Sequence, residues 1–554
     1  MVNPFFKATF YFFLLTVLFT SCEEKKLEKE FSEQLILEIE SLESDTVLIH
    51  GESILQADLI SDMYQKGEAF LSQKWSYKGN TRQLLEAIKM IEQEGLNPDD
   101  YHLKGIEALM EKIANSNPVS TEDVANLELL LSDAFLLLSS HLAAGKTDAK
   151  TIDPQWHAAK RGIAIDWSSF IDSVLEAKKV SETLQSLSPH HSQYINLTKA
   201  LKRYKLIEKN GGWEPFHSNE KKLEQGMIHP DIVLLRNRLS ISQGYIETNT
   251  EDENLFDSTL HQQLVTFQRR NGLPNDGVMG QKTIDALNIS VEDRIASIEA
   301  NLERWRWIDD SLGKKHILVN IADFKLQLIE DKKVIFETEA IVGKPYRKTP
   351  VFSSSMTYLV LNPDWTIPPT ILKNDILPAV RKNQKYLAQK NMKVLSRDGK
   401  EIDPSIIDWQ NVSSASFPYT IKQSPGKDNA LGKVKFIFPN EYNVYIHDTP
   451  SRELFAQSER TFSSGCIRVN RPIELAKILL ADHPKLSPDQ FDKRLQQTTP
   501  QTIVLENVIA VHLIYLTAWS DEEGTVYFRR DIYDRDTALL AALKKSYKPS
   551  TERN

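Results

Sequence analysis

The sequence predicts a multidomain α+β protein in which helical segments come first and a β-rich domain follows. With 554 residues the chain is long enough for about three domains of ~100–200 residues each. Apolar residues recur at intervals of three and four through residues 23–220, as they do on the buried faces of helices. Beyond residue 313, short runs rich in β-branched residues take over, and such runs are typical of strands.

Residues 1–22 have the composition of an export signal. Lys7 precedes an apolar run over residues 8–20, which is shorter than the ~17–25 residues that cross a bilayer as a helix. A small residue then precedes Cys22, which is similar to a bacterial lipoprotein signal and would make Cys22 the lipidated first residue of the mature chain. Because Phe19 departs from the small or aliphatic residue usual at its position, a secreted form and an uncleaved anchor stay open as alternatives.

The charge balance gives no sign of a nucleic-acid partner. The chain has 67 lysine and arginine residues against 76 aspartate and glutamate residues, for a net charge of −9. A nucleic-acid-binding protein usually carries a basic surface, so no such partner is expected. The resemblance of residues 1–22 to a lipoprotein signal implies a protein on the periplasmic face of the cell envelope, held there as a membrane-anchored lipoprotein, with a secreted form or an uncleaved anchor as the alternatives.

Residues 23–220 are expected to form a helical domain. Three histidines in it, His141, His190 and His191, lack further ligands at suitable spacing, so no metal site is predicted. Charged residues interrupt its most apolar segment, so no membrane-spanning helix is expected there either. We interpret the apolar stripe of that segment as core packing: Leu127, Leu130, Leu131, Ala134, Phe135, Leu138 and Leu142.

Residues 221–290 are expected to form a compact unit of short helices. The order Phe267-Gln268, Gly272-Leu273, Asp276-Gly277-Val278-Met279-Gly280 and Thr283 to Leu287 resembles the peptidoglycan-binding domain of three short helices. A small packing module without a ligand is the alternative. Residues 291–312 are expected to form a linking helix to the last domain.

Residues 313–540 are expected to form the β-rich domain, and residues 541–554 a basic tail. The domain begins with a predicted meander of three strands over residues 317–321, 324–329 and 334–342.

A helical insertion is predicted within this domain. From about residue 369 to 431 the apolar spacing returns to that of a helix. Residues 433–438 and 442–447 then predict a pair of strands, and residues 514–519 and 525–528 later β-like segments.

Cys466 would carry the single free thiol of a mature chain that is lipidated at Cys22. A lone thiol is either a small buried hydrophobic group or a nucleophile with a nearby base. Ser464 and Gly465 precede it, and small residues let backbone N–H groups approach a carbonyl oxygen, as an oxyanion hole requires. His447 follows a β-prone run and should lie at the end of a strand. These features favour the nucleophile.

Arg468 is predicted to share a face with Cys466. It lies two residues further along, and in an extended segment such a spacing returns a side chain to the same side. Its guanidinium could bind a substrate carboxylate, and it should favour the thiolate form of the cysteine. A helix expected after Asn470 would add to the second effect through its dipole.

The segments His447-Asp448-Thr449-Pro450 and Ser463-Ser464-Gly465-Cys466-Ile467-Arg468 together resemble the signature of the L,D-transpeptidases with a YkuD-type catalytic domain, in their large multidomain branch. The resemblance implies that Cys466 is the nucleophile and His447 the base, with no metal and no cofactor. It also implies a helical scaffold domain before the catalytic domain, an insertion that caps the cleft, and acylation of Cys466 by carbapenems.

Three further residues are predicted to serve this site. Tyr445 should share a face with His447 and line the cleft, and Trp365 is expected to form a wall of it. Core packing is the alternative for both aromatic side chains. The backbone carbonyl of Asp448, in preference to its side chain, is predicted to orient His447.

The expected reaction forms peptidoglycan crosslinks through a cysteine thioester and releases a terminal D-amino acid. One alternative is a cysteine peptidase that hydrolyses stem peptides with the same two residues. Another is a non-catalytic lipoprotein that binds the wall through residues 221–290. The expected partners are peptidoglycan stem peptides and glycan, the membrane through Cys22, and cell-wall synthases that supply donor chains.

Overall fold

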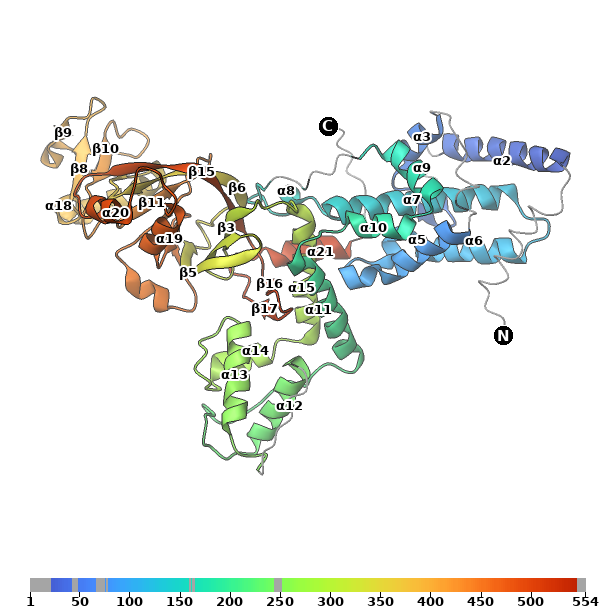
Figure 1. Cartoon of the computed structure of the whole chain (residues 1–554), viewed down its shortest axis with the longest axis horizontal. Coiled ribbons are helices and arrows are strands. Elements are labelled where there is room, and N and C mark those ends of the chain that lie inside the picture. The colour runs from blue at the N-terminus through green and yellow to red at the C-terminus, as the bar shows by residue number, and fades with distance from the viewer. Residues whose placement is uncertain are drawn as a thin grey trace.

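The computed structural model describes residues 21–41, 48–65, 75, 78–158, 161, 165–243 and 252–545. The predicted export signal lies outside these residues except for its last two positions, which begin helix α2 (Ser21–Ser41). The side chain of Cys22, the predicted lipidation site, lies outside the description, as does most of the predicted basic tail. Figure 1 shows the helical part at one end of the molecule, the β-rich part at the other, and a small helical unit projecting between them.

The helical part packs around the long helix α7 (Thr121–Ala144). The Ser120 hydroxyl accepts a hydrogen bond from the Asp123 N–H and caps its first turn. The helix is long and apolar enough to cross a membrane, but 89% of its apolar window is buried inside the protein, so it is a core helix. Its neighbours are α2, α3 (Ala57–Gln65), α5 (Lys78–Met90), α6 (Leu103–Asn115), α9 (Trp167–Ala177) and α10 (Val180–Leu187).

The small unit contains α12 (Asp231–Gln243), α13 (Ser258–Arg270) and α14 (Gln281–Leu287), the three short helices expected. It has its own hydrophobic core, to which each of these helices contributes. Two longer helices, α11 (Ser192–Lys209) and α15 (Val291–Trp307), lead into and out of it and pack on each other. Both belong to the hydrophobic core of the β-rich part, so α11 joins that part although it lies within the range predicted for the helical domain.

The β-rich part is built on a nine-stranded sheet in the order β13-β5-β14-β12-β11-β6-β15-β3-β4. Strand β4 also pairs with β5, so the strands from β5 round to β4 close into a barrel. The bounds are β3 (Lys315–Asn320), β4 (Lys325–Glu330), β5 (Lys333–Gly343), β6 (Phe352–Leu361), β11 (Val434–Ile437), β12 (Ile446–His447), β13 (Thr461–Ser463), β14 (Ile467–Val469) and β15 (Gln501–Ile514). The predicted three-stranded meander corresponds to β3, β4 and β5.

Two predicted strands differ from the structure. Asn443 has a φ of 55°, in the left-handed region, which breaks the expected strand over 442–447 and leaves only Ile446 and His447 in β12. At the other end, residues 501–514 form β15, whereas the prediction began only at residue 514. Two shorter strands follow, β16 (Ala518–Ser520) and β17 (Val526–Phe528).

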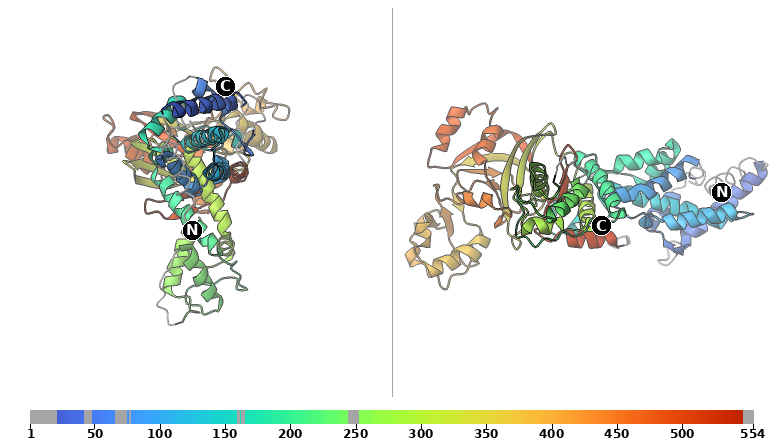
Figure 2. Two further views of the ribbon diagram at one scale, coloured as in Figure 1. Left: turned by 90° about the vertical axis from the view of Figure 1, so that its right-hand side faces the viewer. Right: turned by 90° about the horizontal axis from the view of Figure 1, so that it is seen from below.

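The insertion is helical in its first half and contains strands in its second. Its helical elements are α16 (Pro369–Ile371), the π-helical turn η3 (Leu372–Ile376), α17 (Leu377–Lys382) and α18 (Tyr386–Gln389). Three strands follow the helices: β8 (Met392–Leu395), β9 (Glu401–Ile402) and β10 (Thr420–Gln423). With β7 (Trp365–Thr366), which precedes the helices, they form a sheet in the order β7-β10-β8-β9. It has a hydrophobic core of its own and lies at the end of the molecule away from the helical part (Figures 1 and 2).

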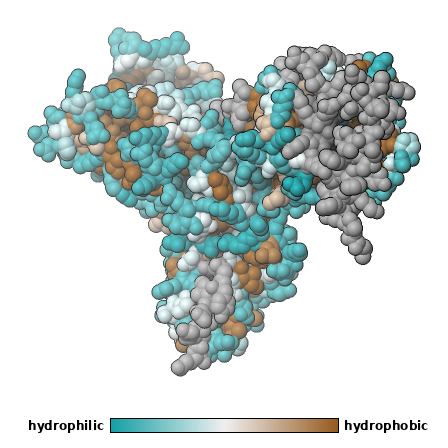
Figure 3. Space-filling model, turned by 45° about the vertical axis from the view of Figure 1, so that its right-hand side comes forward, coloured by the Kyte–Doolittle hydropathy of each residue, from teal (hydrophilic) through white to brown (hydrophobic). Residues whose placement is uncertain are grey.

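The visible surface is mostly hydrophilic. In Figure 3 the apolar residues form several separate patches over the β-rich part and the small helical unit. At the junction of the parts, α21 (Asp536–Lys544) packs against α15.

Candidate active site

The predicted site residues meet on one face of two neighbouring strands. Strands β12 and β14 run parallel, with His447 opposite Arg468 and Ile446 opposite Ile467. Because side chains alternate along a strand, the residues one step before the two isoleucines, Tyr445 and Cys466, lie on the same face as His447 and Arg468. Four of the predicted site residues therefore form one group.

His447 is held by its own backbone neighbour. Its Nδ1 lies 2.6 Å from the carbonyl oxygen of Asp448 and donates a proton to it in the tautomer that leaves Nε2 as a base. The side chain is only 5% exposed. Burial, followed by the charges of Arg468 and Lys435, lowers the pKa of His447 to about 3. The imidazole is therefore neutral at neutral pH and able to accept a proton.

The Asp448 carboxylate has a different role from the Asp448 backbone carbonyl, which orients His447. It accepts hydrogen bonds from the backbone N–H groups of Lys433, at 2.7 Å, and Thr449, at 2.6 Å, and pairs with Arg452. Burial raises the pKa of this carboxyl group. The side chain fixes the strand ends around His447 and makes no contact with the imidazole among those the structure describes.

Cys466 is partly exposed, and its Sγ lies 3.7 Å from the carbonyl oxygen of Asn443. Burial raises the pKa of the thiol, although hydrogen bonding to Tyr445 and the charges of Lys435 and Arg468 oppose the rise. Arg468 favours the thiolate, as expected, but desolvation is the larger effect and the net pKa of the thiol is raised. Among the contacts of the described residues, no hydrogen bond joins this thiol to His447.

The loop before Cys466 is fixed by backbone contacts. Gly465 has a φ of 116°, a conformation that favours glycine, and its N–H donates to the Ser463 hydroxyl at 3.1 Å. That hydroxyl donates to the Cys466 carbonyl at 2.6 Å. The Gly465 N–H is thus not free for an oxyanion, contrary to expectation. The Cys466 N–H has no acceptor in the described part of the chain and is the better candidate.

The Ser464 hydroxyl, expected near the oxyanion, is also engaged. It accepts a hydrogen bond from Arg347 at 2.7 Å, and the same guanidinium nitrogen contacts the Asp375 carboxylate at 2.8 Å. Asp375 lies in η3 of the insertion. A polar chain therefore joins the insertion to the cysteine loop, a link that the sequence did not predict.

Arg468 has no ion-pair partner among the described residues, and its Nε is buried without a hydrogen bond. Burial lowers its pKa, while Cys466 and Tyr445 favour its charged form. A buried guanidinium without an anion is suited to bind the carboxylate of a ligand.

Lys435 completes the site and is not among the residues predicted from the sequence. It lies opposite His447 in β11, and its Nζ stands 4.0 Å above the centre of the Tyr445 ring. Its pKa is lowered by burial, which Cys466 opposes. The alternation of the predicted strand 433–438 would have identified Lys435 as a charged residue beside the histidine strand.

Tyr445 and Trp365 lie close together beside the thiol. The Tyr445 and His447 rings are 5.5 Å apart. Burial and the neighbouring Cys466 raise the pKa of the phenol, and the indole N–H of Trp365 opposes this rise. Trp365 lies in β7, at the edge of the insertion, and packs against the core of the insertion. Trp365 thus lies beside the thiol site and also packs against the core of the insertion, so both predicted roles, cleft wall and core residue, fit its position.

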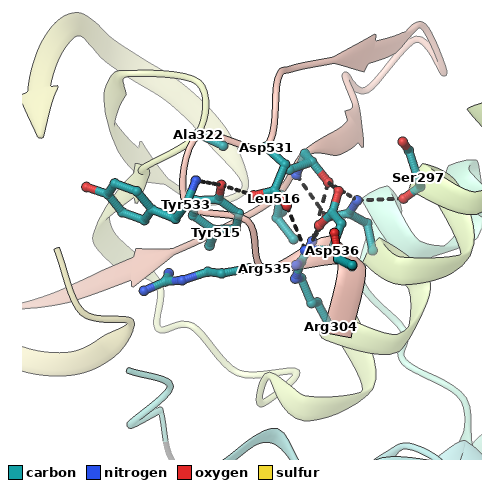
Figure 4. A network of polar contacts seen from close by, with 12 residues as sticks. Ser297, Arg304, Ala322, Tyr515, Leu516, Asp531, Tyr533, Arg535 and Asp536 are labelled. Carbon is teal, nitrogen blue, oxygen red and sulfur yellow. Dashed lines mark hydrogen bonds and ion pairs between the residues drawn. The ribbon is translucent and has the colours of Figure 1, made fainter. Parts of the chain in front are cut away.

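A second set of hydrogen bonds stabilises the loop before Cys466. The Thr349 hydroxyl donates to the Gly465 carbonyl at 2.9 Å, and the Thr349 N–H donates to the Tyr533 hydroxyl at 3.2 Å. Tyr533 belongs to the polar network of Figure 4, in which its N–H donates to the Tyr515 hydroxyl at 3.0 Å. Nearby, Arg304 of α15 pairs with Asp536 at 2.6 Å. The linking helix, the C-terminal segment and the cysteine loop are thus connected.

No group of three or more His, Cys, Asp or Glu side chains suited to a metal ion occurs within the described ranges. Of the three histidines considered in the sequence, His141 is buried in α7, and burial lowers its pKa to about 3. His191 stacks on Trp305 with ring centres 4.3 Å apart. His190 donates its backbone N–H to Asp310 at 3.0 Å.

Family models match three parts of the chain. Residues 58–201 match "Scaffold domain", residues 228–287 match "Putative peptidoglycan binding domain", and residues 314–500 match "L,D-transpeptidase catalytic domain". The chain thus combines a helical scaffold domain, a peptidoglycan-binding domain and a β-rich YkuD catalytic domain. The group around Cys466 lies inside the last of these ranges.

One curated relative is a protein of Haemophilus influenzae named "Putative L,D-transpeptidase". The two sequences are 37% identical over 243 residues, which make up 44% of this chain and 48% of the relative. The chain thus spans about half the length of that relative.

Two solved structures of L,D-transpeptidases are also similar. The one from Xylanimonas cellulosilytica is 14% identical with a TM-score of 0.17, and the match covers 54% of this chain and 100% of that one. The one from Stackebrandtia nassauensis is 13% identical with a TM-score of 0.20, covering 54% and 97%. These TM-scores are too low for either structure to bear on the function of this chain.

Proposed function

We propose that this chain, which contains the catalytic domain of the L,D-transpeptidases, crosslinks peptidoglycan through an acyl-enzyme on Cys466. The observation that carries the proposal is the shared face of β12 and β14, where a thiol, a neutral buried imidazole and an unpaired guanidinium lie together. A nucleophile, a base and an anion-binding group are what acyl transfer from a carboxylate-bearing peptide needs.

In the first half-reaction, the Cys466 sulfur attacks the carbonyl carbon at the L-to-D bond of a donor stem peptide. His447 accepts the thiol proton at Nε2 and returns it to the leaving nitrogen, so the terminal D-amino acid departs as an amine. A thioester remains on Cys466. The free N–H of Cys466 is suited to stabilise the oxyanion, since it has no other acceptor in the described part of the chain.

In the second half-reaction, the side-chain amine of a second stem peptide attacks the thioester carbon. His447 takes a proton from that amine, an amide bond forms, and the thiol is restored. Water in place of the amine would give hydrolysis, the outcome expected of a cysteine peptidase. Arg468 is proposed to bind a carboxylate of the donor, and Tyr445 and Trp365 to line the cleft beside it.

The location and partners of the enzyme are part of the proposal. The apolar start of the chain and Cys22 support a lipoprotein on the periplasmic face of the envelope. The peptidoglycan-binding domain, matched over residues 228–287, supports glycan and stem peptides as ligands. Cell-wall synthases that supply donor chains are proposed as partners, and carbapenems as acylating inhibitors.

Muropeptide analysis tests the reaction. Purified tetrapeptide stems are incubated with the wild-type chain and with the Cys466→Ala variant, and the products are separated by mass. Crosslinked dimers and free D-amino acid from the wild type alone are the expected result. Shortened monomers without dimers would identify a hydrolase. Unchanged stems would favour the remaining alternative, a non-catalytic protein that binds the wall.

A further inference from the structure

Three buried arginines meet where the peptidoglycan-binding domain contacts the rest of the protein. Arg238, Arg270 and Arg294 come from α12, α13 and α15, and their exposed fractions are 5%, 9% and 6%. They line one small pocket. Tyr204 of α11 and Phe528 of β17 line it too, so the pocket lies between the peptidoglycan-binding domain and the β-rich part, to which α11 belongs.

The hydrogen bonds of this arginine cluster go to neutral acceptors. Arg238 donates twice to the Leu287 carbonyl, at 2.9 and 2.7 Å. Arg270 donates to the Val526 carbonyl at 3.1 Å. Arg294 donates to the Asn271 side chain at 2.6 Å and to the Ala286 carbonyl at 3.2 Å.

One donor in the cluster has no partner. The NH1 group of Arg238 is buried and makes no hydrogen bond. The same guanidinium lies 3.9 Å from the centre of the Trp213 ring, which fixes its plane at the pocket wall. A buried donor left unsatisfied costs free energy, so a ligand atom that accepts its proton would be favoured.

The other arginines buried to this degree in the described part of the chain all have an anionic partner. Each forms an ion pair: Arg161 with Asp310, Arg236 with Asp257, Arg304 with Asp536, Arg306 with Glu303, and Arg535 with Asp153. The cluster of Arg238, Arg270 and Arg294 forms none among the described residues. Asp521 and Asp293 favour the charged forms of Arg270 and Arg294 without pairing with them.

Burial and mutual repulsion of the three guanidinium groups also favour an anion in this pocket. Burial lowers the pKa of Arg238 to about 9 and that of Arg294 to about 10, and the positive charges of the cluster act on each other in the same direction. Three guanidinium groups in a poorly solvated site repel each other, and an anion between them would relieve both the repulsion and the desolvation.

We propose that this pocket binds a small oxyanion, a carboxylate or a phosphate group, which joins the peptidoglycan-binding domain to α11 and to the β-rich part. The ligand is either a free ion or the anionic end of a larger molecule. The site is separate from Cys466, and its test does not depend on the proposed reaction.

Thermal unfolding of the full chain tests the site, with inorganic phosphate and acetate as probes and sodium chloride at equal ionic strength as the reference. Saturating phosphate or acetate should raise the melting temperature of the wild type by about 2–4 °C above the chloride reference. A phosphate response without an acetate response would assign the site to phosphate groups, and the reverse to carboxylates. No saturable response to either would overturn the proposal.

Two variants of helix α12 make the test specific. Arg238→Gln should abolish the anion response, whatever its melting temperature without anion, since it loses a repulsive charge and also two hydrogen bonds to the Leu287 carbonyl. Arg236→Gln is the matched control: it breaks an ion pair with Asp257 at 2.8 Å, so it should lower the melting temperature yet keep the anion response. An anion response that survives in Arg238→Gln would contradict the assignment.

Chemical modification gives a readout that needs no variant. Phenylglyoxal reacts with accessible guanidinium groups, and peptide mass mapping locates the products. Phosphate should slow modification of whichever of Arg238, Arg270 and Arg294 the reagent reaches, and leave an exposed residue of the insertion such as Arg397 unchanged. Equal rates with and without phosphate would count against the site.

Discussion

His447 and Arg468 are register partners in two parallel strands, and the guanidinium helps to keep the imidazole uncharged. Burial is the larger cause of the low His447 pKa, and Arg468 adds to it because a second positive charge beside it is unfavourable. The pair thus provides a neutral imidazole that can accept a proton and a guanidinium that can bind a substrate carboxylate.

The pH profile of acylation should reflect this relationship. With a pKa of about 3, His447 stays neutral from pH 5 to 9, so a plot of the logarithm of the acylation rate against pH should show no inflection near the ordinary histidine pKa of ~6.5. Intact-protein mass spectrometry with a carbapenem at a series of pH values measures the rate. An inflection near 6.5 that disappears in His447→Gln would mean that the imidazole titrates normally.

Acid should destabilise the fold partly through the same histidine. The folded-state pKa is depressed, so the stabilising contribution is present above the unfolded-state value of ~6.5 and is lost as the pH falls toward 3. The slope due to one such group is at most about 1.4 kcal/mol per pH unit. Urea unfolding at pH 6.5 and 4.5 should show less acid destabilisation in His447→Gln than in the wild type. The exposed His217→Gln variant should match the wild type.

Lys435 should be a determinant of thiol reactivity. Its charge opposes the burial that raises the Cys466 pKa. Lys435→Gln should therefore shift the pH dependence of iodoacetamide alkylation to higher pH and slow alkylation at pH 7, because less of the thiol is then ionised. Lys435→Arg retains the charge and should behave nearly as the wild type. Identical profiles for Lys435→Gln and the wild type would exclude Lys435 from this role.

The link from the insertion to the cysteine loop should matter for acylation. Arg347→Gln removes the donor to Ser464 and the ion pair with Asp375, and we expect a loss of about tenfold or more in acylation rate because the loop is less well held. Asp375→Asn keeps the Ser464 contact and should lose less. Equal losses in both variants would mean that the insertion contact, not the Ser464 contact, carries the effect.

Gly465 should be sensitive to a Cβ atom for conformational reasons. At a φ of 116° any other residue is strained, although a Cβ there would meet only the Lys348 carbonyl oxygen, at 3.8 Å. Gly465→Ala should cost about 1–3 kcal/mol locally and reduce acylation. Gly399, in an open turn of the insertion at a φ of 83°, is the control, since Gly399→Ala adds similar strain far from the site. Normal acylation in Gly465→Ala would show that the loop tolerates another conformation.

The sequence predicted which residues lie together better than it predicted the strands that hold them. Spacing along an extended chain was enough to bring Cys466 and Arg468 to one face, and the shared face with Tyr445 and His447 follows from the pairing of β12 with β14. The parallel pairing of β12 with β14 joins segments that are separated in the sequence, and the alternation of side chains within one strand cannot reveal it. Lys435 was missed for another reason: its strand was predicted to pair with the histidine strand, but the register that sets Lys435 opposite His447 was not predicted.

Other differences between the predictions and the structure have local causes. The long strand β15 shifts register between Val504 and Ile509, which interrupts the alternation that would have marked it. The Cys466 pKa depends on a balance between desolvation and neighbouring charges, and spacing indicates the charges but not the burial. The contacts of Gly465 and Ser464 involve Ser463 and Arg347, whose roles depend on side-chain positions.

The central claim is that Cys466 forms the acyl-enzyme. Intact-protein mass spectrometry after a brief incubation with a tetrapeptide donor and no acceptor tests it most directly, with peptide mapping to locate the adduct. The wild type should gain the mass of the donor less its terminal D-amino acid, on Cys466, and Cys466→Ala should gain nothing. An adduct that persists in Cys466→Ala, or one that maps to another residue, would contradict the claim.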